Sequence, residues 1–170
     1  QAAAVVLDQH TGELKAIVGS RDVPTTQKSL NRAYQSRMPV GSSIKPITVY
    51  GPAFDAGCGL GTIIENIPVA IPGWGTAAGY PKTSTGTYGP TPIRTGIVKS
   101  LNIVAARTLM TKVGIENSYN YLVNLGVSTK ALNADGVGLA LGTSGITVIE
   151  MAGAYGCIAN GGTYLEPLSF

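Results

Sequence analysis

The stretch Pro39-Val40-Gly41-Ser42-Ser43-Ile44-Lys45-Pro46 constrains the fold of this chain more than any other stretch does. Glycine permits a sharp backbone turn at Gly41, and a proline is tolerated in the first turn of a helix, where backbone N–H groups lack intrahelical partners. We therefore predict a helix that begins at about Ser42 and runs with a buried apolar stripe towards Gly57. In such a helix Ser42 and Lys45 share one face, so a hydroxyl and an amine can meet.

The Ser42–Lys45 pair is a candidate catalytic site. A serine hydroxyl becomes an effective nucleophile when a neighbouring base takes its proton. Lys45 can be that base only if its pKa falls from about 10.4 towards 7, which burial and the positive end of a helix both favour. The spacing Ser-x-x-Lys also arises by chance in chains of this length, so the pair needs support from further motifs.

Composition and charge narrow the class of protein. A chain of 170 residues with 44% hydrophobic and 12% charged residues is typical of one folded domain with a core. The net charge is +3, and the Lys and Arg residues are scattered, so nucleic-acid binding is not favoured. No apolar run reaches the roughly 18 residues that a membrane span needs. Because the chain opens directly on a strand-like Ala2–Leu7, we expect it to be a piece of a longer protein whose membrane anchor lies in another segment.

Cysteine and histidine residues give no metal-binding pattern. Cys58 and Cys157 are far apart in the sequence, and His10 is the only histidine, so neither a zinc site nor another metal or cofactor is expected. The two cysteines either form a disulfide or are two buried thiols, and their small apolar neighbours favour the thiols. His10 lies in a turn, which favours an exposed position over a role in a Ser-His-Asp triad.

Hydrophobic periodicity and turn residues predict the remaining elements. In order, they are a hairpin in residues 1–20, polar loops in 21–41, an irregular stretch in 57–92, helices in 93–113, 115–125 and 139–158, a turn in 159–162, and a strand from 163. A long irregular stretch in a compact domain is usually a functional loop. Its aromatic residues Trp74, Tyr80 and Tyr88 either line a cleft, which makes Trp74 and Tyr88 candidate substrate-binding residues, or pack the loop locally.

A second motif, Ser100-Leu101-Asn102, interrupts the helical stretch 93–113. A loop there presents both polar side chains to a cleft. The Ser100 hydroxyl is a candidate relay for a proton between Lys45 and a leaving nitrogen, and the Asn102 amide is a candidate ligand of a peptide-like substrate. Ser118-Tyr119-Asn120 has the same spacing but lies within a regular helical pattern, so we interpret it as solvent-facing or capping.

Taken together in their order and spacing, these motifs resemble the transpeptidase domain of penicillin-binding proteins, and the bifunctional (class A) type is the more similar. The resemblance rests on Gly41–Pro46, preceded by Leu30-Asn31-Arg32-Ala33 and followed by Ser100-Leu101-Asn102. It extends over almost the whole chain through Thr11-Gly12-Glu13, Tyr88–Arg94, Ile149–Gly156 and Ala159-Asn160-Gly161-Gly162.

The resemblance implies an α/β fold of the α+β type, the penicillin-binding and serine β-lactamase-like transpeptidase fold. In that fold an antiparallel sheet is flanked by helices, with a largely helical subdomain, and it would be incomplete in this chain. The resemblance further implies one partial domain over residues 1–170, with the first hairpin in 1–20 and a mostly helical subdomain that carries the active-site motifs in 42–160.

The same resemblance implies a D,D-transpeptidase that crosslinks peptidoglycan on the extracytoplasmic face of the bacterial membrane. Ser42 would attack the penultimate D-alanine of a stem peptide, and Lys45 would be the general base, a role that is disputed in related serine enzymes. Ser100 would shuttle a proton to the leaving nitrogen, and Asn102 would bind the substrate backbone and help to hold Lys45. β-Lactam antibiotics would be trapped covalently at Ser42.

One departure from the family concerns its third motif, Lys-Thr-Gly, which sits on a strand beside the active site. No Lys-Thr-Gly occurs in this sequence, and the similar Lys82-Thr83-Ser84-Thr85-Gly86 contains an insertion and precedes Ser100. The missing strand would supply half of the oxyanion hole and the groups that bind the substrate carboxylate. We therefore expect a second chain or fragment to carry it, and this chain alone to be inactive.

Four alternatives remain open at this point. A D,D-carboxypeptidase differs only in accepting water. A serine β-lactamase needs a base for deacylation, and no Glu-x-x-Leu-Asn occurs in this sequence. A β-lactam-sensing receptor domain acylates once and signals. A purely structural module would form no adduct at all.

Overall fold

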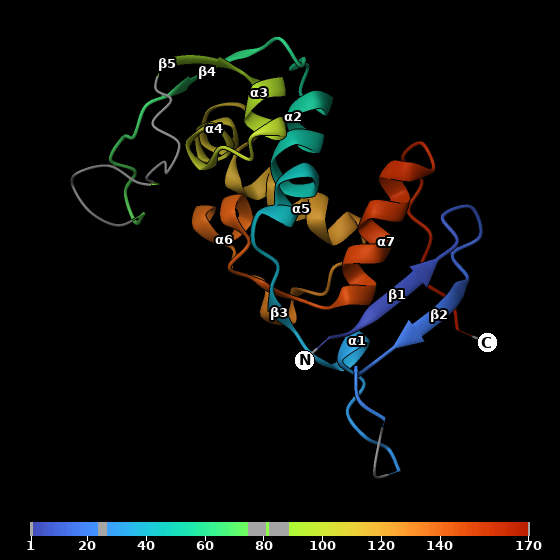
Figure 1. Ribbon diagram of the computed structural model, residues 1–170. Coiled ribbons are helices and arrows are strands. Elements are labelled where there is room, and N and C mark those ends of the chain that lie inside the picture. Colours follow the sequence, from blue (N-terminus) through green and yellow to red (C-terminus); the bar gives the residue numbers. More distant parts are fainter. Residues whose placement is uncertain (1, 24–26, 75–80, 82–88, 170) are drawn as a thin grey trace. The chain divides into compact units, whose positions relative to one another are not determined.

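The computed structural model describes residues 2–23, 27–74, 81 and 89–169. The chain divides into two compact units that interleave along the sequence (Figure 1). Unit 1 comprises Gln1–Pro39, Leu122–Leu132 and Ser144–Phe170, and unit 2 comprises Val40–Tyr121 and Asn133–Thr143. The stretch 42–160, predicted to form the helical subdomain, contributes to both units, and the organisation as one partial domain over 1–170 stays a prediction.

Unit 1 is built on an antiparallel hairpin of β1 (Ala4–Leu7) and β2 (Leu14–Val18), within the stretch for which the sequence predicts one. Alternate residues of β1 are half-buried, as expected for a strand with one face covered, and β1 contacts the helix α7 (Val148–Ala159). The turn needs glycine because Gly12 has a φ of +80°, and a side chain there would collide with the backbone of residue 166.

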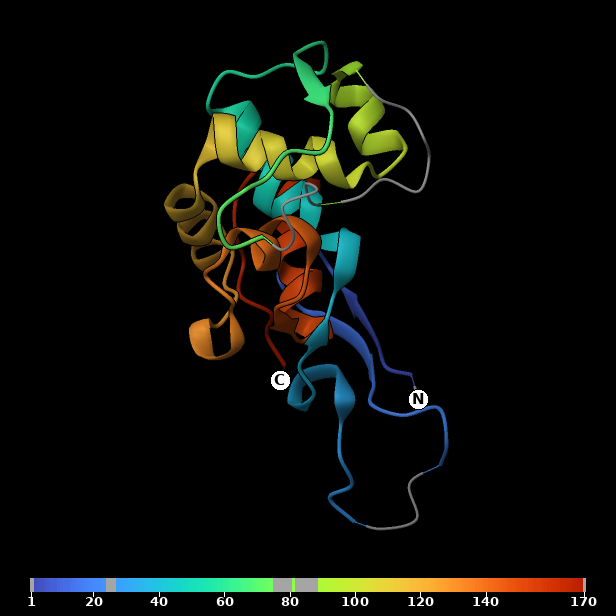
Figure 2. The ribbon, with the colours of Figure 1, turned by 90° about the vertical axis from the view of Figure 1, so that its left-hand side faces the viewer.

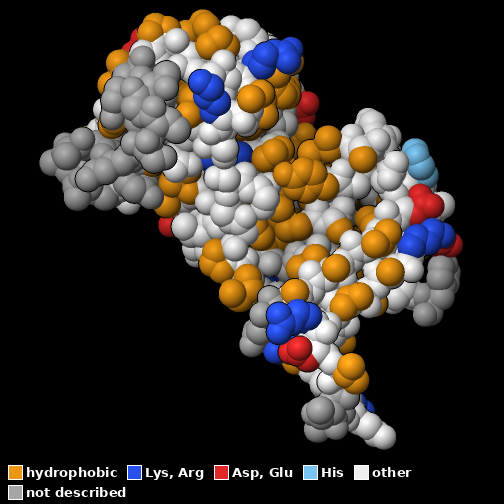
Figure 3. Space-filling model, in the orientation of Figure 1, with side chains coloured by type: hydrophobic (Ala, Val, Ile, Leu, Met, Phe, Trp, Pro, Cys, Tyr) orange, Lys and Arg blue, Asp and Glu red, His pale blue; other side chains and the backbone are white. Residues whose placement is uncertain are grey.

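Apolar side chains of this hairpin remain at the surface (Figure 3). Val6, Ile17 and Val18 are 56%, 39% and 50% exposed. In the part of the chain that the structure describes, β1 and β2 form a two-stranded sheet without a third strand. Exposed apolar groups on a sheet of this kind are typical of a surface that another element covers.

The polar stretch 21–41 contains two short elements that the sequence does not predict. The helix α1 (Arg32–Gln35) is capped by the Asn31 side chain, which accepts a hydrogen bond from the Ala33 N–H. The strand β3 (Met38–Pro39) pairs with β6 (Gly145–Ile146). Both elements are too short to leave a hydrophobic period in the sequence, which explains why periodicity misses them.

The predicted helix over 139–158 is wrong as one element. It is divided into α6 (Gly136–Leu141), in unit 2, and α7, in unit 1. Gly142 ends α6 with a left-handed backbone, and a capping box of Thr147 and Glu150 starts α7.

The predicted strand from residue 163 is also wrong. Residues 163–167 are irregular, and only an isolated bridge joins Leu168 to Glu13. The predicted turn in 159–162 explains the difference, because the Asn160 side chain bonds both the N–H and the carbonyl of Thr163 and so holds that backbone locally.

A helical segment from residue 41 to residue 55 forms the centre of unit 2, close to the predicted bounds. It consists of a 3-10 helix (Gly41–Ile44), a π-helical turn (Pro46–Tyr50) and α2 (Gly51–Asp55). Its irregularity has a covalent cause, because Pro46 has no N–H to donate to the preceding turn. Lys45 and Tyr50 are buried on this segment together with Ile44, Ile47 and Val49.

The stretch predicted as irregular, 57–92, contains a second hairpin. Strand β4 (Ile63–Asn66) pairs antiparallel with β5 (Gly89–Pro92), and β4 contacts the helix α4 (Asn102–Thr108) (Figure 2). Two of the four residues in β5 are prolines, which are confined to edge strands because they donate no ladder hydrogen bond. That composition is typical of a loop, so the sequence does not predict a strand here.

The helices after β5 follow the sequence prediction. They are α3 (Ile93–Val98), α4 (Asn102–Thr108) with a π-helical turn (Leu109–Val113), and α5 (Ile115–Asn124). However, Ser118, predicted to be solvent-facing or capping, is fully buried, and its hydroxyl donates to the Thr48 carbonyl. The core of unit 2 includes Ile93, Ile103, Val104, Ala105, Leu109 and Leu139, each at most 1% exposed. The break between α3 and α4 falls at Ser100 and Leu101, as predicted.

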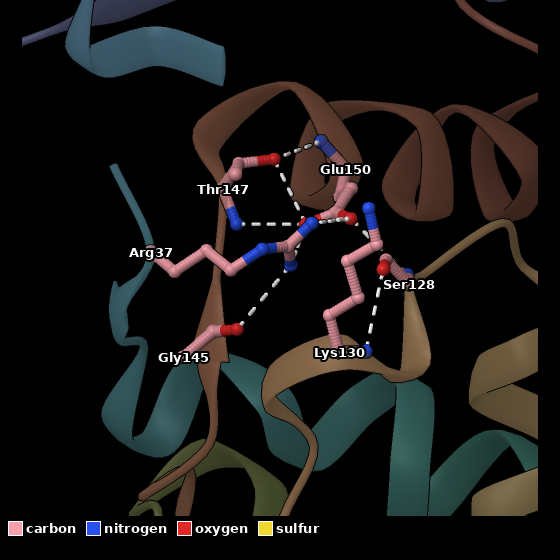
Figure 4. A network of polar contacts seen from close by, with 6 residues as sticks. All are labelled: Arg37, Ser128, Lys130, Gly145, Thr147 and Glu150. Atoms are coloured by element: carbon pink, nitrogen blue, oxygen red, sulfur yellow. Dashed lines mark hydrogen bonds and ion pairs between the residues drawn. The ribbon is translucent and has the colours of Figure 1, made fainter. Parts of the chain in front are cut away.

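A polar network joins several segments of unit 1 (Figure 4). Glu150 receives two hydrogen bonds of 2.8 Å from the Arg37 guanidinium, and two more from the N–H groups of Thr147 (2.9 Å) and Ser128 (3.1 Å). Arg37 also donates to the Gly145 carbonyl at 3.5 Å. Burial alone would raise the pKa of Glu150, but the hydrogen bonds from Arg37, Thr147 and Ser128 outweigh it and hold the pKa below its usual range.

Replacing Glu150 with glutamine is expected to lower the free energy of unfolding by about 2 kcal/mol at pH 7, because the Arg37 charge loses its partner. The folded pKa lies below the ordinary 4.5, so the unfolded chain takes up its proton first as the pH falls. The deficit of the variant should therefore shrink below pH 4.5 in urea unfolding curves. The exposed Glu166→Gln is the matched control, and an equal loss there would contradict this assignment.

Candidate active site

Ser42 lies in the 3-10 helix at the start of the central segment of unit 2. The Lys45 N–H donates to the Ser42 carbonyl, which closes one 3-10 turn. Such a helix has about three residues per turn, so side chains at i and i+3 are eclipsed. The turn therefore puts the Ser42 hydroxyl and the Lys45 side chain on one face, although no hydrogen bond links the two side chains. Ser42 is exposed to solvent.

Lys45 is the buried member of the site, with 2% of its surface exposed. Its Nζ donates to the Ser100 carbonyl (2.8 Å), the Ser100 hydroxyl (3.2 Å) and Asn102 Oδ1 (2.6 Å). In the described part of the chain no carboxylate forms an ion pair with it. Burial consequently lowers the pKa of Lys45 to about 8, which leaves a substantial neutral fraction near neutral pH.

Ser100 occupies a backbone conformation that glycine normally takes. Its φ is +51°, and the Ser100 and Leu101 N–H groups bond the carbonyls of Ile97 and Gly96. These two bonds form a Schellman motif that ends α3, with Ser100 at the left-handed position. A side chain at that position costs about 1–2 kcal/mol, which the fold tolerates while the hydroxyl contacts Lys45.

Replacing Ser100 with glycine should therefore raise the free energy of unfolding relative to Ser100→Ala by about 1 kcal/mol, because only glycine relieves the backbone strain. Both variants lose the hydroxyl, so a difference in their stability reports the backbone conformation alone. Urea unfolding compares the two stabilities. A glycine variant less stable than the alanine variant would contradict the strain.

Asn102 is the first residue of α4, and the two ends of its side-chain amide face different groups. Its Oδ1 accepts from Lys45, which orients the amide so that the Nδ2 donors point away from the lysine. Because Asn102 is exposed, these donors can reach a ligand. The described structure thus brings together Lys45, Ser100 and Asn102 by hydrogen bonds, and Ser42 through the shared face of its turn.

The aromatic candidates are placed differently. Trp74 is only 5% exposed, and a side chain on Gly136 would meet its ring at 2.2 Å, so the ring packs on the start of α6. This position fits the alternative of local packing, and a substrate contact by Trp74 stays a prediction. Tyr80 and Tyr88 lie outside the described residues.

Two buried positions of unit 2 contact the site without any sequence motif that marks them. They are Thr48, on the central segment, and Gly142, at the end of α6. Gly142 lies inside the stretch 139–158 that the sequence predicts to be one helix, and nothing in the local sequence distinguishes Thr48 from an ordinary helical threonine.

The possible metal ligands and the two cysteines are scattered over the described residues. No group of three or more His, Cys, Asp or Glu side chains is placed there to hold a metal ion. Cys157, in unit 1, and Cys58, in unit 2, are both free thiols. His10 is exposed in the hairpin turn. Within the same residues, no helix has the length and apolar character that crossing a membrane requires.

Comparison with known proteins shows the family of this chain. Residues 2–169 match the family model described as the penicillin-binding protein transpeptidase domain, and the chain belongs to this family. It is 36% identical over 167 residues to penicillin-binding protein 1A of Haemophilus influenzae, and 34% identical over 169 residues to penicillin-binding protein 1A of Pseudomonas aeruginosa. Each match covers 98% of this chain but only 19% and 20% of the relatives, so the chain spans about one fifth of their length.

Solved structures show the same relationship. The crystal structure of penicillin-binding protein 1A from Haemophilus influenzae superimposes with a TM-score of 0.85 at 36% identity, over 98% of this chain and 24% of that one. The penicillin-binding protein PonA1 from Mycobacterium tuberculosis, solved in complex with penicillin V, gives a TM-score of 0.81 at 24% identity, over 98% of this chain and 45% of that one. The fold is therefore the transpeptidase fold of penicillin-binding proteins, with a partial sheet.

Proposed function

We propose that this chain carries the acylation site of a peptidoglycan D,D-transpeptidase, which crosslinks stem peptides through a serine acyl-enzyme. The observation that supports this most is the environment of Lys45, which is buried without a carboxylate and hydrogen-bonded to both polar residues of the second motif. A lysine with a pKa near 8 is suited to remove a proton from a neighbouring hydroxyl.

In the proposed acylation, the neutral Lys45 amine takes the Ser42 hydroxyl proton while Oγ attacks the carbonyl carbon of the penultimate D-alanine. The Ser42 backbone N–H, at the start of its helical segment, donates to the oxyanion that forms. The C–N bond to the terminal D-alanine then breaks, and the leaving nitrogen takes a proton that passes from Lys45 through the Ser100 hydroxyl. The products are an ester on Ser42 and free D-alanine.

In the proposed deacylation, the amine of a second stem peptide attacks the ester carbonyl. Its proton returns through Ser100 and Lys45 to Ser42 Oγ, which restores the free serine and closes the crosslink. Asn102 donates from Nδ2 to a backbone carbonyl of the bound peptide. A β-lactam follows the first half only, because its opened ring stays attached and blocks the second amine.

The proposal includes a second polypeptide that carries the Lys-Thr-Gly strand and completes the oxyanion hole. The exposed apolar side chains of Val6, Ile17 and Val18 support a covering partner for the hairpin. The substrate also dictates the place of action, since peptidoglycan lies on the extracytoplasmic face of the bacterial membrane. We propose that a segment outside this sequence anchors the enzyme there.

The test is a turnover assay on the protein as purified together with the polypeptide that supplies the third motif. With a stem pentapeptide as donor and an amino-terminated acceptor, we expect release of one D-alanine for each crosslinked product. Release without crosslinking would identify a D,D-carboxypeptidase instead. A single acylation without turnover would identify a sensor, and rapid hydrolysis of penicillin would identify a β-lactamase.

A further inference from the structure

The turn that carries Ser42 and Lys45 is one short 3-10 helix, Gly41–Ile44. The Ser43 hydroxyl donates to the Val40 carbonyl, and a 3-10 bond runs from the Lys45 N–H to the Ser42 carbonyl. The next residue, Pro46, has no N–H, so the regular bond that would tie it to the preceding turn is absent. The orientation of such a turn depends on contacts from outside it.

Besides the hydrogen bonds of Lys45 to Ser100 and Asn102, two such contacts come from one element, the C-terminal half of α6 with its cap Gly142. The Gly41 N–H donates to the Gly142 carbonyl at 3.0 Å, directly before Ser42. Thr48 Oγ1, three residues after Lys45, lies 2.6 Å from the Leu139 carbonyl. The two hydrogen bonds therefore bracket the nucleophile and its base.

Gly142 allows the first contact. Its φ is +76°, and a Cβ there would lie 2.0 Å from the Gly41 oxygen and 2.6 Å from both the Gly41 nitrogen and carbonyl carbon. All three atoms belong to the backbone, which cannot move aside as a flexible side chain can. Any residue other than glycine would therefore push α6 away from the turn.

Thr48 allows the second contact. It is fully buried, and its hydroxyl also lies 3.0 Å from the Ile44 carbonyl, while its own carbonyl accepts a hydrogen bond from the buried Ser118 hydroxyl at 2.7 Å. A valine of the same shape would fill this space without a polar group. The hydroxyl is therefore needed for its bonds and not for packing.

We propose that Thr48 and Gly142 are positioning residues for acyl transfer at Ser42. Their two hydrogen bonds, which we call the brace, hold both ends of the catalytic turn against α6. The proposal rests on the proposed function for its activity readout, but the brace itself is a structural property. Loss of a positioning contact misplaces reacting groups, and a displacement of about 1 Å can cost about 100-fold in rate.

The first test is amide hydrogen exchange in the intact protein as purified, with the Thr48→Val variant. The Gly41 N–H should exchange at least about 10-fold faster, while the Ala105 N–H within α4, bonded to the Leu101 carbonyl, should keep its rate. Thr108→Val is the matched control, because Thr108 is equally buried but its hydroxyl has no partner. Equal acceleration at Gly41 and Ala105 would indicate general destabilisation and overturn the brace.

The second test separates binding from chemistry with a penicillin. In Thr48→Val the acylation rate constant should fall about 10- to 100-fold while the dissociation constant of the non-covalent complex changes little, and Thr108→Val should match the wild type. Gly142→Ala should be affected more strongly, and Thr48→Val remains informative if that variant does not fold. An unchanged rate constant in Thr48→Val overturns the brace alone, whereas no acylation of the wild type overturns the proposed function.

Discussion

Replacing Ser42 with alanine is expected to abolish covalent labelling by penicillin. The wild-type protein, purified with the polypeptide that completes its site, should gain the mass of one intact penicillin, because ring opening transfers an acyl group without losing atoms. Peptide mass spectrometry should locate the adduct on the fragment that contains Ser42. The variant has no hydroxyl to attack, so the adduct should disappear.

Ser43→Ala is the matched control for that experiment. Ser43 is the adjacent serine on the same turn and is also exposed, but its hydroxyl donates to the Val40 carbonyl at 2.7 Å. This variant should be labelled at the wild-type stoichiometry. An adduct that survives in Ser42→Ala, or that is lost in Ser43→Ala, would show that the nucleophile is assigned to the wrong residue.

Replacing Lys45 with methionine is expected to slow acylation by about 100-fold or more, because the general base is lost while the buried volume is nearly kept. The wild-type acylation rate should rise with pH through a midpoint near 8, as the Lys45 ammonium loses its proton. The variant should show no such rise. Stopped-flow or quenched labelling with a chromogenic β-lactam over pH 6 to 10 gives both profiles.

The same substitution also tests the pKa of Lys45 through stability. Its folded pKa of about 8 lies below the ordinary value of 10.5, so between these pH values the unfolded chain holds a proton that the folded chain has released. The stability of the wild type relative to Lys45→Met should therefore increase as the pH rises from 8 to 10.5. The exposed Lys99→Met is the control, and a difference that is independent of pH would contradict the assignment.

The sequence predicted the four polar residues of the site because they fall into two short motifs, Ser42–Lys45 and Ser100–Asn102. Two local features of the sequence mark these motifs without any tertiary information. A proline follows the Ser42–Lys45 spacing, and a break between two helical patterns falls at Ser100. The burial of Lys45, which lowers its pKa, is not local. The Lys45 Nζ is held by Ser100 and Asn102, which the chain brings back after more than fifty intervening residues.

The parts that the sequence did not reveal depend on partners far along the chain or on atypical composition. Thr48 has an ordinary helical context, and the Leu139 carbonyl that its hydroxyl contacts lies 91 positions further along the chain. Strand β5 is half proline, so its strand character comes from pairing with β4 and not from propensity. The helix predicted over 139–158 failed because Gly142 ends α6 with a left-handed backbone, and β6 and the Thr147 cap separate it from α7.

The backbone of Ser100 has a consequence for laboratory evolution of this chain. Selection for heat tolerance alone would favour glycine at this position, since glycine relaxes the left-handed geometry that serine endures. Such a library would become more stable while its members are expected to react more slowly with penicillin. A screen that scores labelling together with melting temperature should instead retain the serine and accumulate its stabilising changes elsewhere.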